Sequence, residues 1–516
     1  MELKPCRHLV VILGDQLDEA SSAFDGFDAS QDLVLMIEAR EESTHVWSHK
    51  ARTVLFLSAM RHFAETLKQR GWRIRYRALD QEADATLADG LLAAVAEHQP
   101  QQVIAVEPGD LRVRHNLNTS LKTGGHPAIA WREDKHFLCS AARFRHWAGQ
   151  STSLRMEFFY RTLRRHYQVL MKDGQPEGGK WNYDAENRKG FGRAGPQNVP
   201  RPIVFAQDGI TQDVMALVER EFAGHPGDLH RFNWPVTRAQ ALEALADFVE
   251  HRLPDFGVHQ DAMWTHLDFG WHALLSSSLN LKLLNPLEVV HAAEQAWRER
   301  GLALASVEGF IRQVLGWREF MRGVYFLDMP ALKTDNHFDH QQRLPAWYWT
   351  GETRMNCMRQ CINQTLANGY SHHIQRLMVT GMFGITAQIQ PQALCDWYLA
   401  VYVDAVEWVE LPNTAGMALF ANGGRFTSKP YVASGAYVKR MSNYCSSCSY
   451  EPETRIGPTA CPMTTLYWNF LDEHEPAFAG NPRTALMVKN LQRMSAEERL
   501  AVKARAAQML ANLNEL

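Results

Sequence analysis

The chain has 516 residues, of which 46% are hydrophobic and 22% charged, a composition that excludes a disordered protein and predicts roughly two to four folded domains. The formal net charge of −3 excludes nucleic-acid binding through overall positive charge, so any such contact requires a local basic patch. The chain contains eight cysteines, opens with the pattern of a buried strand, and has no apolar run long enough to span a bilayer. These features predict a cytoplasmic protein without a membrane contact.

Strand-like and helix-like patterns alternate over residues 1–140. Short apolar runs predict five buried strands at 8–13, 33–38, 73–79, 102–106 and 128–132. Apolar residues at helical spacing predict a long helix over 47–70. Together they predict an α/β domain with a doubly wound parallel sheet. The turn at 14–17 (GDQL) follows the first strand at the edge where such folds bind ligands, but no G-x-G-x-x-G fingerprint identifies the ligand.

The rest of the chain has a different character. Residues 141–235 begin with a polar helix and continue into a stretch rich in Gly, Pro and Asn, which predicts a long ordered connection between domains. From 236 to 516 the patterns are almost wholly helical and predict a large all-helical C-terminal domain. Two basic segments, 161–172 and 178–193, lie in the connection, and from charge alone a solvated helix face and a loop explain them.

Four cysteines in the C-terminal half form the clearest candidate metal site. Cys445, Cys448 and Cys461 follow the pattern C-x2-C-x12-C-P, and Cys357 lies upstream in a helical segment. A C-x2-C turn places two thiolates on one ion or cluster, so the trio predicts bound zinc or iron. Cys357 taken alone has the pattern of an ordinary buried cysteine, but it would complete a four-thiolate set.

Several helical segments carry side chains suited to binding or proton transfer. Three serines at 276–278 either cap a helix or bind phosphate through exposed amides. Glu308 and Arg312 recur at helical spacing, a pattern typical of an ion-paired helix. His372 and His373 are adjacent on an otherwise apolar helix, next to an arginine, an arrangement suited to proton chemistry.

Taken together, these segments resemble the cryptochrome/photolyase family and, within it, the bacterial iron–sulfur branch of (6-4) photolyase type. The resemblance covers almost the whole chain. Its most specific markers are the cysteine spacing, the HHIQRLMV helix, EWVELPN and KPYVASGAYVKRMSNYC, while 275–279 align with the family's L-S-P-Y-L phosphate-binding turn. The implied organisation is an α/β antenna domain over 1–140, a connection over 141–235 and a helical FAD-binding catalytic domain over 236–516.

The resemblance implies three cofactors. It implies a [4Fe–4S] cluster rather than zinc on Cys357, Cys445, Cys448 and Cys461. It implies folded-back FAD contacted by His272, Ser276, Glu308, Arg312, Trp317, Arg376, Asp404 and Glu410. It implies a second chromophore, 6,7-dimethyl-8-ribityllumazine, near Gly14, Asp15, Gln16 and Glu38. The cluster has two candidate roles, electron relay and structural cross-link, and we expect the structural one because the cluster closes a long loop.

The electron route departs from the wider family. Most photolyases carry N-W-Q-W beside the flavin, whereas this chain reads V-E-W-V at 406–409, so the usual tryptophan triad does not transfer. Branch resemblance implies a route through Trp397, Tyr398 and Trp349, with Trp347 as the alternative outermost site.

The implied activity is light-driven repair of (6-4) pyrimidine–pyrimidone photoproducts in ultraviolet-damaged DNA by a monomeric enzyme. Excited FADH⁻ would donate an electron to a flipped-out lesion. His373, with His372 as its neighbour, would supply a proton to the lesion. Tyr431 and Tyr437 would flank it. One rival is a cryptochrome-type blue-light photoreceptor with the same cofactors. Another is a zinc-stapled nucleic-acid-binding protein, which would be colourless.

Overall fold

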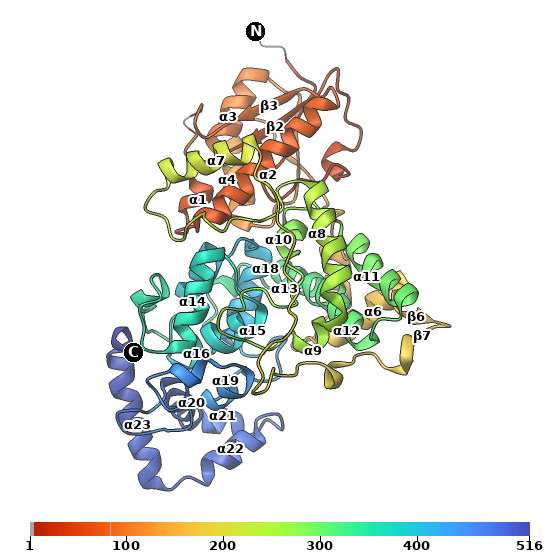
Figure 1. Cartoon of the computed structure of the whole chain (residues 1–516). Helices are drawn as coiled ribbons and strands as arrows, with labels where there is room; N and C mark the ends of the chain where they lie inside the picture. The colour runs from red at the N-terminus through yellow and green to blue at the C-terminus, as the bar shows by residue number, and fades with distance from the viewer. Residues whose placement is uncertain (1–4, 83) are drawn as a thin grey trace.

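The computed structural model describes residues 5–82 and 84–516. Figure 1 shows an α/β part at the top and a larger helical part below it, with the C-terminus in the lower part. Among the described residues, no helix combines the length and the apolar character needed to cross a membrane.

The α/β part is built on a five-stranded parallel sheet with the order β3-β2-β1-β4-β5. Its strands are β1 (His8–Val11), β2 (Leu33–Ile37), β3 (Ile74–Arg77), β4 (Gln102–Val106) and β5 (Ala130–Arg132). All five predicted strands are therefore confirmed, and the structure shortens four of them by one to three residues. The strand order reverses at β1, so the turn that follows this strand lies at the switch point of the sheet.

Alternating side chains of the strands enter two separate cores. Leu9 and Val11 of β1 pack with α3 (Leu87–His98) and α4 (Leu111–Thr123), whereas Val10 and Ile12 pack with α2 (Lys50–Gln69) on the opposite face. Both faces of the sheet are covered, which confirms the doubly wound architecture and explains why the strands are nearly continuous apolar runs. A short helix, α1 (Glu41–Thr44), precedes α2.

The connection is only partly a loop. It contains α5 (Ala141–Ala148), α6 (Met156–Tyr167), a hairpin of β6 (Met171–Lys172) and β7 (Gln175–Pro176), and α7 (Gly209–Glu221). Between the hairpin and α7 the chain runs without regular helices apart from two single 3₁₀ turns. Helix α7 packs against α2, so the end of the connection returns to the α/β part, as Figure 1 shows.

The helical part contains sixteen α-helices within the described residues, interrupted by three π-helices. The first eight are α8 (Arg238–His251), α9 (Leu253–His259), α10 (Ser276–Asn280), α11 (Pro286–Arg300), α12 (Leu304–Ile311), α13 (Glu319–Asp328), α14 (Asn356–Asn368) and α15 (His373–Gln375). The others are α16 (Met382–Thr386), α17 (Pro391–Val401), α18 (Glu407–Leu411), α19 (Gly435–Met441), α20 (Pro462–Glu473), α21 (Glu475–Ala479), α22 (Ala485–Gln492) and α23 (Ala496–Ala511). The π-helices are η4 (Arg312–Arg318), η7 (Arg376–Gly381) and η8 (Pro412–Ala418), a rare conformation that is frequent at functional sites.

Backbone hydrogen bonds join the α/β part to the helical part. The amide of His49, just before α2, donates to the carbonyl of Ala400 at 2.8 Å. The amide of Trp408 donates to the carbonyl of Gly109 at 3.1 Å. A Cβ on Gly109 would lie 2.4 Å from the Trp408 ring, so the close approach of the two parts here requires glycine. The V-E-W-V segment therefore lies at the junction of the two parts.

Candidate active site

Four polar side chains from separate segments meet in the helical part. Ser276, at the start of α10, donates from Oγ to Asp404 Oδ2 at 2.6 Å. Arg376, at the start of η7, places Nη2 3.1 Å from Asp404 Oδ1 and Nη1 3.8 Å from Glu410 Oε2. The fold thus brings together half of the residues that the resemblance assigns to FAD, from α10, η7, α18 and the loop before α18.

Burial and charge set the protonation of this polar group. Burial and then the negative charge of Asp404 raise the pKa of Glu410 to about 7, although the charge of Arg376 opposes the shift. Burial alone would lower the pKa of Arg376, but the charge of Asp404 outweighs it, so the guanidinium stays ionised. That guanidinium lies 3.7 Å from the centre of the Tyr402 ring. The group therefore combines a fixed cation with a carboxyl that titrates near neutral pH.

Buried polar atoms without partners adjoin this group. Within residues 5–82 and 84–516, the hydroxyls of Ser277 and Ser278 and Nδ1 of His372 are buried and make no hydrogen bond. An unpaired buried polar atom costs about 1–3 kcal/mol, so such a set indicates a polar ligand between these segments. FAD offers phosphate, ribityl and ring atoms that would pair with hydroxyls and an imidazole, so the residues present fit this cofactor.

The adjacent histidines have different environments. His372 is buried, and its ring stacks on His272 with centroids 4.4 Å apart and planes inclined by 14°. Burial, and then the neighbouring His272, lower the pKa of His372 well below its ordinary value. His373 is the first residue of α15 and is exposed to solvent. Even so, desolvation by the surrounding protein, and then the positive charges of Arg188 and Arg376, lower its pKa to about 4. His373 is therefore the histidine of the pair that a molecule from solvent can reach.

Arg188 connects the interdomain segment to the face around His373. Its positive charge lowers the pKa of His373, Tyr431 and Tyr437, in each case by less than the effect of burial. The guanidinium also lies 3.8 Å from a carboxylate oxygen of Asp261. Burial raises the pKa of both tyrosines, that of Tyr437 to about 12, so both hydroxyls keep their protons. Sequence reasoning marked only the basic stretch that contains Arg188, because nothing local distinguishes this arginine from its neighbours.

Glu308 and Arg312 belong to a second polar group. Arg312 pairs with Asp184 of the connection and places Nε 3.4 Å from Glu308 Oε1. The buried Glu308 also accepts a hydrogen bond from the amide of Tyr183 at 3.2 Å. These contacts tie α12 and η4 to the connection. Trp317, on the same helical run, is partly buried and makes no hydrogen bond to this group among the described residues.

The predicted electron-transfer residues form a chain of aromatic contacts. The ring centroids of Trp397 and Tyr398 are 5.3 Å apart, and those of Trp397 and Trp349 are 6.5 Å apart. Tyr398 in turn lies 5.4 Å from Tyr402, whose ring is under the Arg376 guanidinium. Trp347 is only 2% exposed, and its Nε1 donates to a backbone carbonyl at 2.9 Å.

The four cysteines come from three segments that converge near the N-terminal end of α14. Cys357 lies in the first turn of α14, Cys445 and Cys448 lie in and just after a 3₁₀ turn, and Cys461 precedes α20. Burial, and then the nearby thiols of Cys461, Cys445, Cys361 and Cys448, raise the pKa of Cys357. A Cβ on Gly435 would lie 3.0 Å from the Cys461 sulfur. Among the described residues, no three possible ligands are close enough for a single metal ion, whereas a four-iron cluster is wider and needs thiolates further apart.

A cavity with a volume of about 100 Å³, open to solvent, lies at the switch point of the sheet. Gly14, Asp15 and Glu38 line it, while Gln16 does not and instead donates to the carbonyl of Val106 at 3.2 Å. The Glu38 carboxylate already forms an ion pair, because Arg61 Nε lies 2.7 Å from Glu38 Oε1. Three of the four predicted antenna residues thus share one cavity, and Glu38 forms its wall.

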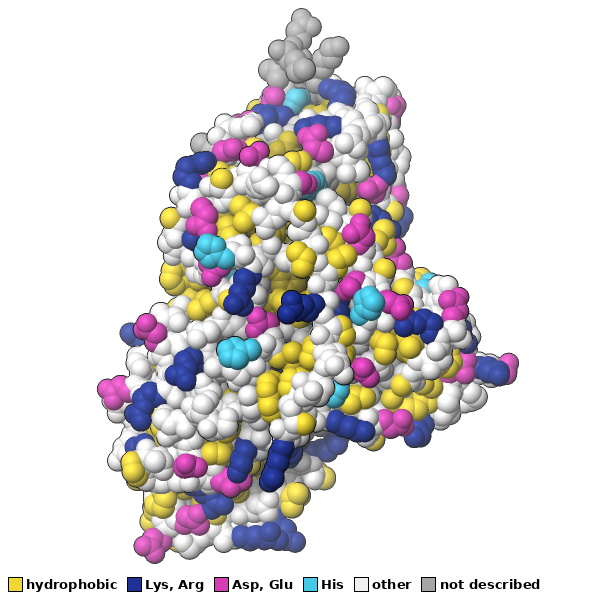
Figure 2. All heavy atoms as spheres, viewed as in Figure 1, with side chains coloured by type: hydrophobic (Ala, Val, Ile, Leu, Met, Phe, Trp, Pro, Cys, Tyr) yellow, Lys and Arg dark blue, Asp and Glu magenta, His cyan; other side chains and the backbone are white. Residues whose placement is uncertain are grey.

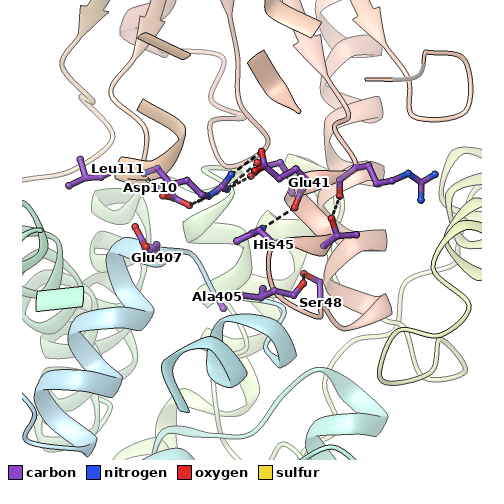
Figure 3. A network of polar contacts seen from close by, with 12 residues as sticks. Glu41, His45, Ser48, Asp110, Leu111, Ala405 and Glu407 are labelled. Atoms are coloured by element: carbon purple, nitrogen blue, oxygen red, sulfur yellow. Dashed lines mark hydrogen bonds and ion pairs between the residues drawn. The ribbon is translucent and has the colours of Figure 1, made fainter. Parts of the chain in front are cut away.

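A charged network that sequence reasoning missed lines the same cavity. Arg112 Nη2 lies 3.0 Å from Glu42 and 3.2 Å from Asp110, and Arg112 Nη1 lies 3.3 Å from Glu41. Figure 3 shows this network with His45, whose ring Nδ1 donates to the Glu41 carbonyl at 3.0 Å. Burial raises the pKa of Glu42, and Arg112 opposes the shift. The acids follow β2 and β4, the two strands that flank β1, so their position after these strands is the sequence signal that identifies them.

The two basic segments differ in what they offer to a polyanion. Arg164 is fully buried and donates to the carbonyls of Val169 and Leu170, so it stabilises the end of α6 and cannot contact DNA. In the second segment, Arg188, Lys189 and Arg193 are exposed. Figure 2 shows basic and acidic side chains interspersed over the face in view, in line with the small net charge.

Comparisons with known proteins extend over the whole chain. A family model described as deoxyribodipyrimidine photo-lyase-related protein matches residues 10–234. A (6-4) photolyase of Agrobacterium fabrum is 45% identical over 508 residues, covering 98% of this chain and 99% of that protein. An uncharacterized protein of Acanthamoeba polyphaga mimivirus is 31% identical over 120 residues, or 23% of this chain and 90% of its own length.

Solved structures share the fold. A bacterial class III photolyase from Agrobacterium tumefaciens aligns with a TM-score of 0.54 at 16% identity, over 86% of this chain and 87% of its own. A cryptochrome of Synechocystis aligns with a TM-score of 0.51 at 15% identity, over 80% of this chain and 83% of the cryptochrome chain. The much higher identity to the A. fabrum protein covers the α/β part, the connection and the helical part together. The chain therefore belongs to the (6-4) photolyase branch of the cryptochrome/photolyase family.

Proposed function

We propose that the protein is a light-driven DNA repair enzyme that restores pyrimidines from (6-4) photoproducts. The observation in the structure that carries this proposal is the exposed His373 at the start of α15, next to the buried His372 that stacks on His272. A relative that covers 98% of this chain is named (6-4) photolyase. A protein that only signals has no need of an exposed imidazole at a face suited to a damaged base.

Different residues of the chain have different roles at the lesion. A damaged base that leaves the duplex is held by stacking and by hydrogen bonds to its edge. The protonated hydroxyls of Tyr431 and Tyr437 are suited to this holding role. His373 delivers a proton to the lesion as the general acid, while the buried, stacked His372 fixes the start of α15. Arg188 offers a positive charge to the phosphate beside the flipped base.

The family implies FAD, which when bound supplies one electron to the lesion on excitation by light. Arg376, Asp404, Glu410 and Ser276 would hold it, with the unpaired hydroxyls of Ser277 and Ser278 beside them. Trp397, Tyr398 and Trp349 would carry electrons toward the site. The other proposed contacts to FAD are His272, Glu308, Arg312 and Trp317.

Two further cofactors belong to the proposal. The four thiols of Cys357, Cys445, Cys448 and Cys461 would hold a [4Fe–4S] cluster, since a four-cysteine donor set is the usual one for such clusters. The cavity beside Gly14, Asp15 and Glu38 would hold 6,7-dimethyl-8-ribityllumazine as the antenna, and Gln16 would fix the turn below it. We further propose that the enzyme acts as a cytoplasmic monomer.

The proposed function is tested by illuminating the purified protein with an oligonucleotide that carries one (6-4) photoproduct. Restoration of the parent thymines, followed by chromatography, is the expected result. His373→Ala should abolish restoration and leave photoreduction of the flavin unchanged, because His373 acts on the lesion only. Binding of the lesion without restoration by the unmodified protein would support the photoreceptor instead.

A further inference from the structure

The aromatic chain does not end at Trp349. The ring of Trp47 lies 4.9 Å from the ring of Trp349, with planes inclined by 52°, in the range of favourable aromatic pairs. Trp47 comes from the α/β part, in the turn between α1 and α2, whereas Trp349 belongs to the helical part. Its side chain is 46% exposed, whereas Trp397 is fully buried and Trp349 is partly buried. The chain of rings therefore runs from the buried interior to solvent.

The turn that carries Trp47 is held against the helical part. The amide of His49 donates to the Ala400 carbonyl at 2.8 Å, and its ring Nε2 lies 2.8 Å from the Leu366 carbonyl. On the next turn of α2, Arg52 donates to the Ala405 carbonyl at 3.3 Å. Figure 3 shows Ser48 and Ala405 facing each other across this junction. These contacts fix the position of Trp47 relative to the helical part.

A competing branch ends inside the protein. Trp397 also meets Tyr348, with centroids 5.0 Å apart, and Tyr348 stacks on Trp347 at 4.8 Å. Trp347 is 2% exposed, and its indole N–H is bonded to a carbonyl. An oxidised indole becomes a much stronger acid and is stabilised when it can release this proton to water. Trp347 has no such exit, whereas the exposed Trp47 does.

We propose that Trp47 is the solvent-exposed terminus of the electron-transfer route and takes electrons from soluble thiols. The inference rests on the proposed photolyase function, because photoexcited flavin is the one-electron oxidant. One electron leaves Trp397, Trp349 reduces Trp397, and Trp47 reduces Trp349. The Trp47 radical cation releases its indole proton to water. The neutral radical then takes one electron and one proton from a thiol, which leaves a thiyl radical and restores the indole.

The test compares flash photolysis of the holoenzyme with oxidised flavin in the unmodified protein and in Trp47→Phe. In the unmodified protein we expect a long-lived neutral tryptophanyl radical that added dithiothreitol removes. In Trp47→Phe this signal should be lost, and photoreduction under steady light should slow several-fold. Trp297→Phe is the matched control, because Trp297 is a partly exposed tryptophan of α11 that pairs with no aromatic ring among residues 5–82 and 84–516. This variant should behave as the unmodified protein does.

Further variants decide between the two branches. Trp349→Phe should abolish the long-lived radical, and adding Trp47→Phe to it should have no further effect, because both residues lie on one route. An unchanged radical lifetime and photoreduction rate in Trp47→Phe, or a slowing in Trp347→Phe instead, overturns the proposal. After chemical reduction of the flavin by dithionite in the dark, Trp47→Phe should repair the (6-4) lesion at the unmodified rate. If neither the unmodified protein nor Trp47→Phe repairs the lesion, the proposed function is refuted. The radical lifetimes of the two proteins would still test the role of Trp47.

Discussion

At the scale of single residues, one peptide bond separates two histidines with different chemistry. His372 is enclosed, stacked on His272 and held neutral, whereas the neighbouring His373 ring reaches solvent. Positive charge from Arg188 and Arg376 faces His373 and disfavours its protonated form. A general acid in this environment is strong but is scarcely populated at neutral pH in the free enzyme.

The pH dependence of repair follows from this shift. The pKa of His373 is lowered to about 4, so its protonated fraction is small at neutral pH and increases steadily as the pH falls toward 4. We therefore expect the repair yield per bound lesion to rise as the pH is lowered from 8 to 6, provided that binding is measured at each pH. A yield that is flat, or that falls toward acid pH, would show that His373 is not the proton donor.

At the scale of elements, a buried ion pair locks the end of β5 to the segment after α10. Lys282 Nζ lies 2.6 Å from Asp134 Oδ2, and both side chains are about 6% exposed. Burial raises the pKa of Asp134, but Lys282 and Arg322 outweigh this effect and lower it to about 2. Because the folded-state pKa is depressed, the pair stabilises the protein above pH 4 and its contribution is lost as the pH falls toward 2.

Removal of one partner should therefore be costly. We expect Lys282→Ala to reduce the free energy of unfolding by about 3 kcal/mol, because it leaves a buried carboxylate unpaired. The matched control is Lys135→Ala, which breaks the neighbouring exposed pair with Asp25 and should change stability by less than about 1 kcal/mol. Urea denaturation followed by tryptophan fluorescence measures both. Equal losses in the two variants would contradict the argument.

The cysteine segments form a second structural junction. Asn356, at the start of α14, donates to the Tyr444 carbonyl at 2.7 Å, next to Cys445, so hydrogen bonds already join two of the three segments. A metal cluster would add a covalent closure of the long loop between Cys357 and Cys461. This geometry favours a mainly structural role for the cluster.

The structural role predicts a loss of folded protein rather than of one activity. Cys448→Ala should reduce the yield of soluble, flavin-containing protein and abolish the cluster absorbance. Cys361→Ser is the matched control, because Cys361 lies on the same helix as Cys357, outside the four-thiol set, and should retain the cluster. Soluble Cys448→Ala protein with a full complement of flavin would contradict a structural role.

At the scale of the whole molecule, an acidic chain must bind DNA through a limited surface. The net charge is −3, and Figure 2 shows mixed signs over the face in view. The exposed cations Arg188, Lys189 and Arg193 belong to the connection, and Arg188 lies at the face of His373. The connection, rather than either flanking part, therefore supplies the clearest local footprint for phosphate.

Lesion binding should weaken as salt is added, because neutralised phosphates release counterions. Replacing Lys189 and Arg193 by Ala should reduce the slope of log affinity against log salt for both damaged and undamaged duplexes, since phosphate contacts carry no lesion specificity. Lys122→Ala, an exposed change at the end of α4, is the control and should leave the slope unchanged. Binding that does not vary with ionic strength would exclude this footprint.

The sequence by itself determined the local features of this protein. Nearly continuous apolar runs identified β1, β2 and β4, because the inner strands of a sheet covered on both faces are buried, whereas the edge strands β3 and β5 are only partly buried. Helical spacing identified α2 to within three residues at its start and one at its end. The family-specific segments around His373 and Cys445 identified the photolyase family, since such long motifs are far more specific than composition.

Tertiary structure alone decided which distant residues meet. Arg188 of the connection faces His373, Trp47 of the α/β part meets Trp349 of the helical part, and Arg164 is buried rather than exposed to DNA. None of these contacts leaves a periodicity or a spacing in the chain, because they depend on how elements pack after they form. The sequence indicated the residue types of the proposed site, and the packing determined which of them lie in contact.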